Sequence, residues 1–195
     1  MNNHDLTWYV QEIVMHGYGA EIEFNALEKT LADADLRQTR LVWFKLTSFL
    51  SHAAMISKYV APIQPNAIKR ERMEALRDCL KINSESEVLP RDARDNVEHF
   101  DERIDNWVGN SGTILEIVLK DREAFEFFER DDPLVPSRLR IKRVLLLEEM
   151  IFISEKRNSQ YFELELKPLN TEILRIATEA NKWVGESSPY KFYYP

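Results

Sequence analysis

The chain has 195 residues, of which 44% are hydrophobic and 30% are charged, so it can bury the core of one domain and keep a polar surface. Its five glycines are too few for an all-β fold, which uses glycine in its many turns. The net charge of −7 argues against a dedicated nucleic-acid coat or a binder of anionic membranes, and the single Cys79 excludes an intramolecular disulfide and a cysteine-based zinc site.

The first predicted element is a helix from Leu6 to about Ala34, with Asp5 as its cap. Gly17 and Gly19 fall in its middle and are expected to mark a kink. The N-terminal stretch "MNNHDLTWYVQE" lacks the basic region and apolar core of a signal peptide. Since no apolar run approaches the roughly 18 residues of a membrane span, the cytoplasm is the expected location.

Two further helices are predicted before residue 90. Leu36 to Ala61 has a broad apolar face and ends at Pro62. His52 lies within that face, where a lone histidine is more often a core or interface residue than a catalytic partner. The third helix covers Asn66 to Ile82, and its inward residues are expected to be Ile68, Met73, Leu76 and Leu80. Cys79, near its end, is expected to be a small buried residue.

The second half changes character after a charged helix, Arg91 to Val108, which "GNSG" closes. "TILEIVLKDREAFEFFERDDP" is ambiguous between helix and strand in its first half. "RIKRVLLLEEMIFIS" and "YFELEL" are rich in strand-forming residues, and "EKRNSQ" between them fits a turn. A last helix begins at Asn170 or Thr171, and its apolar face comprises Ile173, Ile176, Ala177, Ala180 and Val184. The aromatic tail "GESSPYKFYYP" is expected to dock on the body or on a partner.

These elements predict one mainly α-helical domain over residues 1–195. It comprises a helical bundle over about 5–130, a small antiparallel β hairpin or meander over about 140–166, and a final helix over about 170–184. The four histidines are scattered, and none has the spacing to a carboxylate that a known metal ligand set requires. No metal and no other cofactor is therefore expected.

The charged helix carries the candidate site. Ala93, Val97, Phe100, Ile104 and Trp107 recur at core-facing spacing, and His99 lies off this stripe by about 120°. Asp95 is one helical turn before His99, so its carboxylate can hold one ring nitrogen and favour the protonated ring. Arg94 is splayed from His99 by about 140° on an ideal helix. The two act together only with a kink, the reach of the arginine, or a second subunit; alternatively these charges form a solvated helix face.

The segment "RDNVEH", Arg94 to His99, is similar to the Arg-x4-His signature of the HEPN (higher eukaryotes and prokaryotes nucleotide-binding) superfamily, in which a polar residue follows the arginine. The longer "ARDNVEHFDERIDNW" resembles the "RN-x-x-EH-x-D-E-R" segment of uncharacterised bacterial HEPN-like proteins. "FLSHAAMISKYVAP" resembles the helix that precedes that segment, and the order of helices, motif, β element and final helix matches as well.

The resemblance implies a helical bundle that forms a homodimer with the two motifs at the interface. In active members the motif cleaves RNA without metal and leaves a cyclic phosphate, in bacterial defence or toxin–antitoxin systems with an antitoxin partner. If the roles of that motif apply to this chain, His99 is the general acid or base, Arg94 binds the phosphate and Asp95 orients His99. Supporting positions are Asn96, Arg103 and Arg91. The alternative is a non-catalytic HEPN-like binding or assembly module.

The charge of the segment bears on these alternatives. Glu98, Asp101, Glu102 and Asp105 make the motif helix acidic, which repels an RNA backbone. The basic residues expected to compensate, unless they only form solvated faces, are Lys69, Arg70, Arg72, Arg77, Arg138, Arg140, Lys142 and Arg143.

Overall fold

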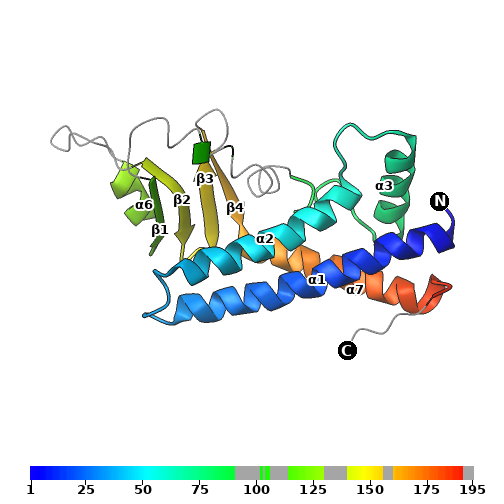
Figure 1. Ribbon diagram of the computed structural model, residues 1–195, viewed down its shortest axis with the longest axis horizontal. Helices are drawn as coiled ribbons and strands as arrows, with labels where there is room; N and C mark the ends of the chain where they lie inside the picture. Colours follow the sequence, from blue (N-terminus) through cyan, green and yellow to red (C-terminus); the bar gives the residue numbers. More distant parts are fainter. Residues whose placement is uncertain (91–101, 103, 106–113, 130–139, 156–159, 191–195) are drawn as a thin grey trace.

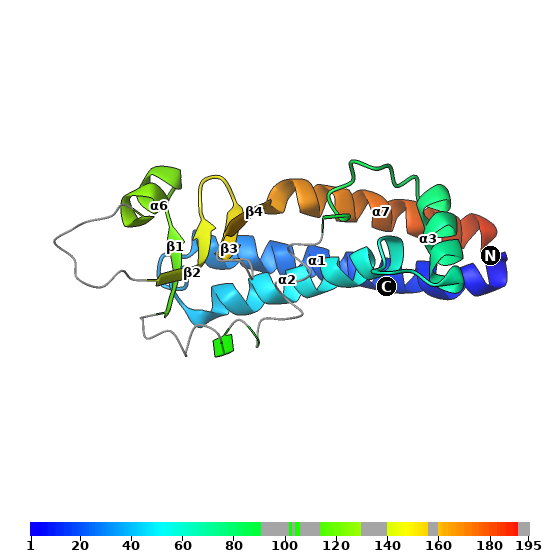
Figure 2. The same ribbon diagram turned by 90° about the horizontal axis from the view of Figure 1, so that it is seen from above.

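The computed structural model describes residues 1–90, 102, 104–105, 114–129, 140–155 and 160–190. Three long helices lie side by side along the molecule: α1 (Asn3–Ala32), α2 (Arg40–Val60) and α7 (Leu166–Ser187) (Figures 1 and 2). A small sheet lies at one end of these helices, and the shorter helix α3 (Ala67–Cys79) at the other. The mainly helical class with a small β element, predicted from the sequence, is confirmed.

Polar side chains fix where the first three helices begin. The Asn2 side chain accepts a hydrogen bond from the Asp5 backbone N–H at 2.9 Å, so Asn2 is the cap of α1 and the prediction of Asp5 was wrong. Thr39 caps α2, which therefore starts four residues after Leu36. The Asn66 side chain caps α3 by accepting a hydrogen bond from the Lys69 N–H at 2.9 Å. Asn66 is therefore the last residue before α3, which was predicted to begin at Asn66.

The two glycines of α1 allow close packing instead of kinking the helix, which is continuous from Asn3 to Ala32. A β-carbon at Gly17 would overlap the Ala177 side chain of α7. A β-carbon at Gly19 would overlap the imidazole of His52 on α2. The expected kink was therefore wrong, because the missing side chains serve contacts with neighbouring helices.

Helix α3 reaches the core only through its second half. Leu76 and Leu80 are fully buried, as the sequence predicts, and Cys79 packs against the same cluster. Ile68 is 65% exposed, so its predicted inward position was wrong. The short helix lies across the end of the bundle, which leaves its first turn in solvent (Figure 1).

The sheet has the strand order β1 (Ile114–Leu119), β2 (Arg140–Leu146), β3 (Ile151–Glu155), β4 (Tyr161–Glu165). The predicted meander is confirmed, since β2, β3 and β4 pair antiparallel. β1 extends it by pairing parallel to β2, which requires a crossover connection. That connection includes α6 (Arg122–Glu129), so the ambiguous stretch contains both a strand and a helix.

Both faces of the sheet contribute buried residues, although β4 is buried on one face only. One face joins the main core formed with the long helices, through Val118, Leu145, Phe152, Phe162 and Leu164. The other packs on α6 in a second cluster of Leu119, Phe125, Val144, Leu146 and Ile153. Helix α7 begins directly after β4, four residues before Asn170, and the predicted apolar face of this helix is buried. No helix in the described part of the chain is long and apolar enough to cross a membrane.

Candidate functional site

The predicted catalytic residues lie outside the described residues, and so do the supporting ones: Arg94, Asp95, His99, Arg91, Asn96 and Arg103. The pairing of Asp95 with His99 stays a prediction. Glu102, Ile104 and Asp105, the described residues of this segment, are helical and exposed. Ile104 was expected to face the core and is 40% exposed, so at this position the predicted stripe was wrong.

The chain approaches the motif through a segment that is fixed to the bundle. Val88 is buried, and the Ser86 hydroxyl donates a short hydrogen bond to the Glu172 carboxylate of α7. Arg175 binds both oxygens of that carboxylate and lowers the pKa of Glu172. Arg175 also donates to the Leu80 carbonyl at 3.2 Å. Residues 80–88 are therefore anchored to α7 just before the motif begins.

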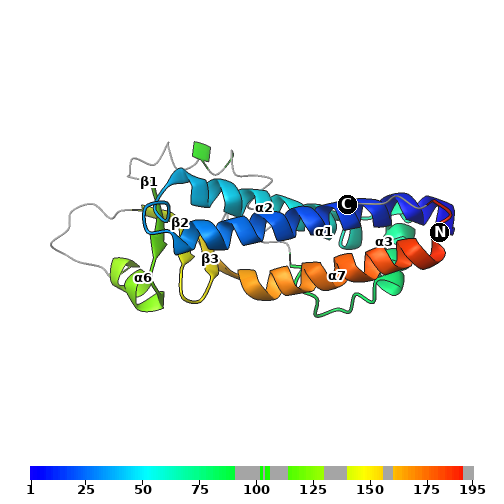
Figure 3. The ribbon, with the colours of Figure 1, turned by 90° about the horizontal axis from the view of Figure 1, so that it is seen from below.

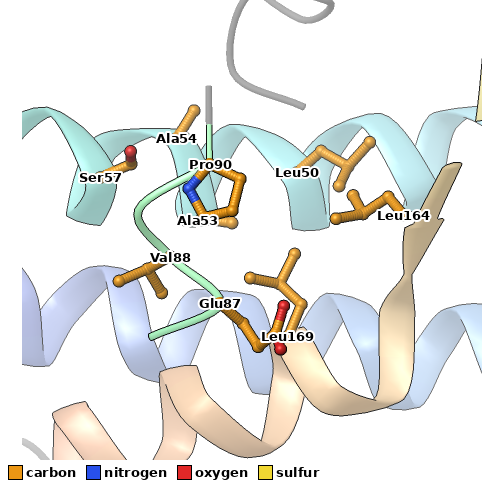
Figure 4. Close-up of a pocket in the computed structure, with 9 residues that line it drawn as sticks. All are labelled: Leu50, Ala53, Ala54, Ser57, Glu87, Val88, Pro90, Leu164 and Leu169. Atoms are coloured by element: carbon orange, nitrogen blue, oxygen red, sulfur yellow. The ribbon is translucent and has the colours of Figure 1, made fainter. Parts of the chain in front are cut away.

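A small cavity lies where this segment meets α2 (Figure 4). Its volume is about 20 Å³, and its walls are Leu50, Ala53, Ala54 and Ser57 of α2, Glu87, Val88 and Pro90, and Leu164 and Leu169. The buried Ser57 hydroxyl has no hydrogen-bond partner among the described residues. The space suits one water molecule and excludes a substrate. Pro90, four residues before Arg94, thus lies against the middle of α2.

A pair of histidines connects α1 and α2. His16 Nδ1 and His52 Nδ1 are 2.9 Å apart, so one ring donates a hydrogen bond to the other. The other ring nitrogen of His16, Nε2, lies 3.8 Å from a carboxylate oxygen of Glu12. His52 is therefore an interface residue, as its position predicts, but its partner was missed. The partner, His16, can be identified only from the antiparallel register of the two helices. The same register brings Tyr9 next to Tyr59 and Glu23 next to Lys45.

The environment of this pair disfavours its protonation. Burial lowers the pKa of His16 below its usual 6.5, the proximity of His52 lowers it further, and Glu12 opposes both effects. The His16 side chain is 13% exposed, which leaves little room for a substrate. Among the residues that the structure describes, no three histidine, cysteine or acidic side chains are grouped to hold a metal ion. We therefore interpret the pair as an element of helix packing.

The histidine pair predicts that stability falls at mildly acidic pH. Since the pKa of His16 is lower in the folded protein, the unfolded chain binds more protons between that pKa and 6.5, and the free energy of unfolding rises with pH across this window. Urea unfolding measured from pH 5 to 7.5 checks this. His16→Gln should flatten the slope, whereas His4→Gln, at an exposed histidine of the same helix, should keep it; equal slopes in all three proteins would contradict the interpretation.

Three of the cations that were expected to compensate for the acidic motif have structural roles. Arg72 donates to the Lys58 carbonyl at 3.1 Å, and Arg77 to the Val60 carbonyl at 2.7 Å. Both bonds satisfy carbonyls at the end of α2, which have no partner within the helix. Arg143 is held by Glu116. Lys69 and Arg70 are exposed, and the side chains of Arg138, Arg140 and Lys142 lie outside the described ones.

Two other sequence predictions have clear outcomes. Burial raises the pKa of the Cys79 thiol to about 11, which fits a packing residue and disfavours a reactive thiolate.

The beginning of the aromatic tail docks on α1, because Ser188 Oγ is 3.1 Å from Thr7 Oγ1 and the Tyr190 ring lies 5.4 Å from His4 and 6.2 Å from Trp8. Residues 191–195 lie outside the described part of the chain.

No protein-family model matches this chain, and neither a curated protein nor a solved structure matches it.

Proposed function

We propose that this chain is an HEPN-like, metal-independent endoribonuclease of a bacterial defence or toxin–antitoxin system, active as a homodimer. The observation that carries the proposal is the segment from Arg94 to Arg103, whose arginine, histidine and acidic residues resemble the extended motif of such proteins. Two features of the fold support it. The domain is mainly helical. The chain leading to the motif is fixed against α2, the helix whose sequence resembles the one before the motif in that superfamily.

The proposed reaction needs an acid–base group and a phosphate ligand. His99 takes the proton of a ribose 2′-hydroxyl, whose oxygen then attacks the adjacent phosphorus. The bond from phosphorus to the 5′-oxygen of the next nucleotide breaks, and a protonated His99 donates a proton to that oxygen. The products are a cyclic phosphate and a free 5′-hydroxyl. Arg94 binds the phosphate oxygens through its planar guanidinium, and Asp95 orients the imidazole.

Loss of the histidine is expected to lower the rate of RNA cleavage in EDTA at least 100-fold, since a general acid–base group contributes on that order. Purified wild type, His99→Ala and Arg94→Ala would be compared on a labelled RNA, and both variants should lose activity. His4→Ala, which removes an exposed histidine on α1, is the matched control and should cleave like the wild type. Cleavage that persists in His99→Ala and Arg94→Ala would refute the proposed chemistry.

A second candidate is a non-catalytic HEPN-like binding or assembly module. The observation that favours it is the structural use of Arg72, Arg77 and Arg143, which leaves fewer cations to offset the acidic motif helix. In that function Arg94 and His99 form contacts between subunits. Wild-type protein that never cleaves RNA, together with a change of oligomeric state in His99→Ala, would support this candidate over the nuclease.

A further inference from the structure

The outer side of α1 and α2, opposite the core, carries large apolar residues. Ile22 on α1 is 65% exposed and Phe44 on α2 is 62% exposed. Met15, Leu41 and Tyr18 are also exposed, and the same line on α1 ends at Trp8, where the Tyr190 ring of the tail lies 6.2 Å away. Helix α7 lies beside α1 on the flank away from α2 (Figure 3), and the buried residues of α1 and α2 belong to the main core. A helix pair at the surface of a monomer normally presents charged and polar residues on such a side.

These exposed residues recur at the spacing of a helix-packing seam. On α1, Trp8, Met15 and Ile22 follow one another at intervals of seven, with Tyr18 between the last two. On α2, the exposed Leu41 and Phe44 are followed by the half-buried Ser48, Ser51 and Met55, and the five positions alternate steps of three and four. An alternation of three and four keeps residues on one stripe that packs against another helix. Each helix therefore has one such stripe toward the core and a second on its outer side.

The two helices carry opposite charge. Helix α1 contains Asp5, Glu12, Glu21, Glu23 and Glu28 and one lysine, Lys29. Helix α2 contains Arg40, Lys45 and Lys58 and no acidic residue. An ion pair between the two helices of one chain already joins these opposite charges, since Lys45 Nζ lies 3.1 Å from a Glu23 carboxylate oxygen. A surface with an acidic and a basic helix side by side is complementary to a copy of itself.

Symmetry then selects one arrangement of two copies. A two-fold axis parallel to the helices places α1 of each copy over α2 of the other, acidic on basic. An axis perpendicular to the helices would place α1 on α1 and α2 on α2, like charge on like charge. The axis parallel to the helices leaves the position of each residue along the helix axis unchanged. Residues of α1 and α2 that lie at the same height within one chain therefore also lie at the same height across the two copies. Because His16 is level with His52, Glu12 lies within one helical turn of the level of Lys58.

We propose that the outer side of α1 and α2 is the surface through which two copies of this chain associate, with each α1 over the partner's α2. The inference rests on the proposed function in one respect, since that function names a homodimer. Ile22 and Phe44 are the central apolar contacts. Glu12 faces the partner's Lys58.

Sedimentation of the full chain tests the apolar part of this surface. The wild type should be a dimer, and Ile22→Asp should weaken it by on the order of tenfold or more. Ile68→Asp is the matched control: Ile68 on α3 is equally exposed but lies away from this surface, so that variant should remain a dimer. Circular dichroism confirms that each variant is folded. A monomeric wild type at high concentration, or loss of the dimer in Ile68→Asp alone, overturns the proposal.

A charge exchange tests the orientation. Glu12→Lys and Lys58→Glu should each weaken the homodimer, because each places like charges opposite one another, and an equimolar mixture should form a heterodimer. Unchanged homodimers of both variants would overturn the orientation. RNA cleavage is read separately: a monomer that cleaves RNA refutes this surface and the homodimer but keeps the cleavage chemistry, whereas a dimer with the expected variant effects but without activity refutes the nuclease and keeps the surface.

Discussion

Replacing Gly17 by alanine is expected to lower the free energy of unfolding by about 1–3 kcal/mol, the range for overpacking a tight contact. Alanine is the better helix former by about 1 kcal/mol, so local propensity alone predicts the opposite sign. The added methyl group would overlap Ala177 Cβ and would lie 3.5 Å from Ala177 Cα, so α1 and α7 would have to move apart. Urea unfolding followed by circular dichroism measures the change.

Gly185→Ala is the matched control for this prediction. Gly185 lies in α7, and apart from the adjacent backbone of that helix no described atom lies within 4 Å of the position that its β-carbon would take. This substitution should therefore stabilise the protein by about 0.5–1 kcal/mol. The double variant Gly17→Ala, Ala177→Gly should recover part of the loss, because it returns the space that the new methyl group needs. Stabilisation by Gly17→Ala itself would show that the two helices do not meet at this point.

The features that the sequence predicted well depend on neighbours within a few residues. The buried face of α7, with Ile173, Ile176 and Ala180, follows from the helical repeat alone. The meander of β2, β3 and β4 follows from short strand-forming runs and local connections. The bounds were less accurate, because caps such as Asn2 and Thr39 compete with other polar residues nearby.

The features that the sequence did not predict depend on contacts between distant parts of the chain. Gly17 suggests a kink until Ala177, far along the sequence, is known to lie against it. His16 and His52 become a pair only in the antiparallel register of α1 and α2. Strand β1 was ambiguous because a short apolar run fits either a strand or a helix, and its parallel partner β2 follows a crossover.

The candidate site also combines features that depend on nearby residues with features that depend on distant contacts. Arg94, Asp95 and His99 were selected from local spacing and from a resemblance, and both are properties of the sequence. The location of Pro90 against α2 required the fold. So did the roles of Arg72 and Arg77, because a cation that binds a helix carbonyl has the same sequence signature as one in solvent.

Removing the charge of Arg143 should produce the largest loss of stability predicted for this chain. Arg143 on β2 and Glu116 on β1 are paired in the sheet register, and Arg143 Nε donates to the Glu116 carboxylate at 2.7 Å. Their side chains are 13% and 17% exposed, and the guanidinium lies 5.5 Å from the centre of the Trp43 ring. Burial lowers the pKa of Arg143, and Glu116 opposes this by stabilising the charged form.

Arg143→Met is expected to lower the free energy of unfolding by about 3–5 kcal/mol, because it leaves the Glu116 carboxylate buried without its partner. The exposed Arg40, 3.7 Å from the other carboxylate oxygen, compensates little. The double variant Arg143→Met, Glu116→Leu should be much less destabilised than the single one, since an apolar pair of similar volume can replace a buried ion pair at little cost. Urea unfolding of the wild type, both single variants and the double variant at neutral pH measures this coupling.

The exposed pair of Arg122 and Glu163 provides the control, because it has the same chemistry in a different environment. Arg122 binds Glu163 through two nitrogens, but the two side chains are 39% and 45% exposed. Arg122→Met should therefore cost at most about 1 kcal/mol. A comparable loss in both arginine variants would show that burial does not set the strength of the Arg143 pair. A large loss only in Arg143→Met, reversed in the double variant, would show that the unpaired carboxylate, rather than the lost arginine, destabilises the sheet where it joins α2.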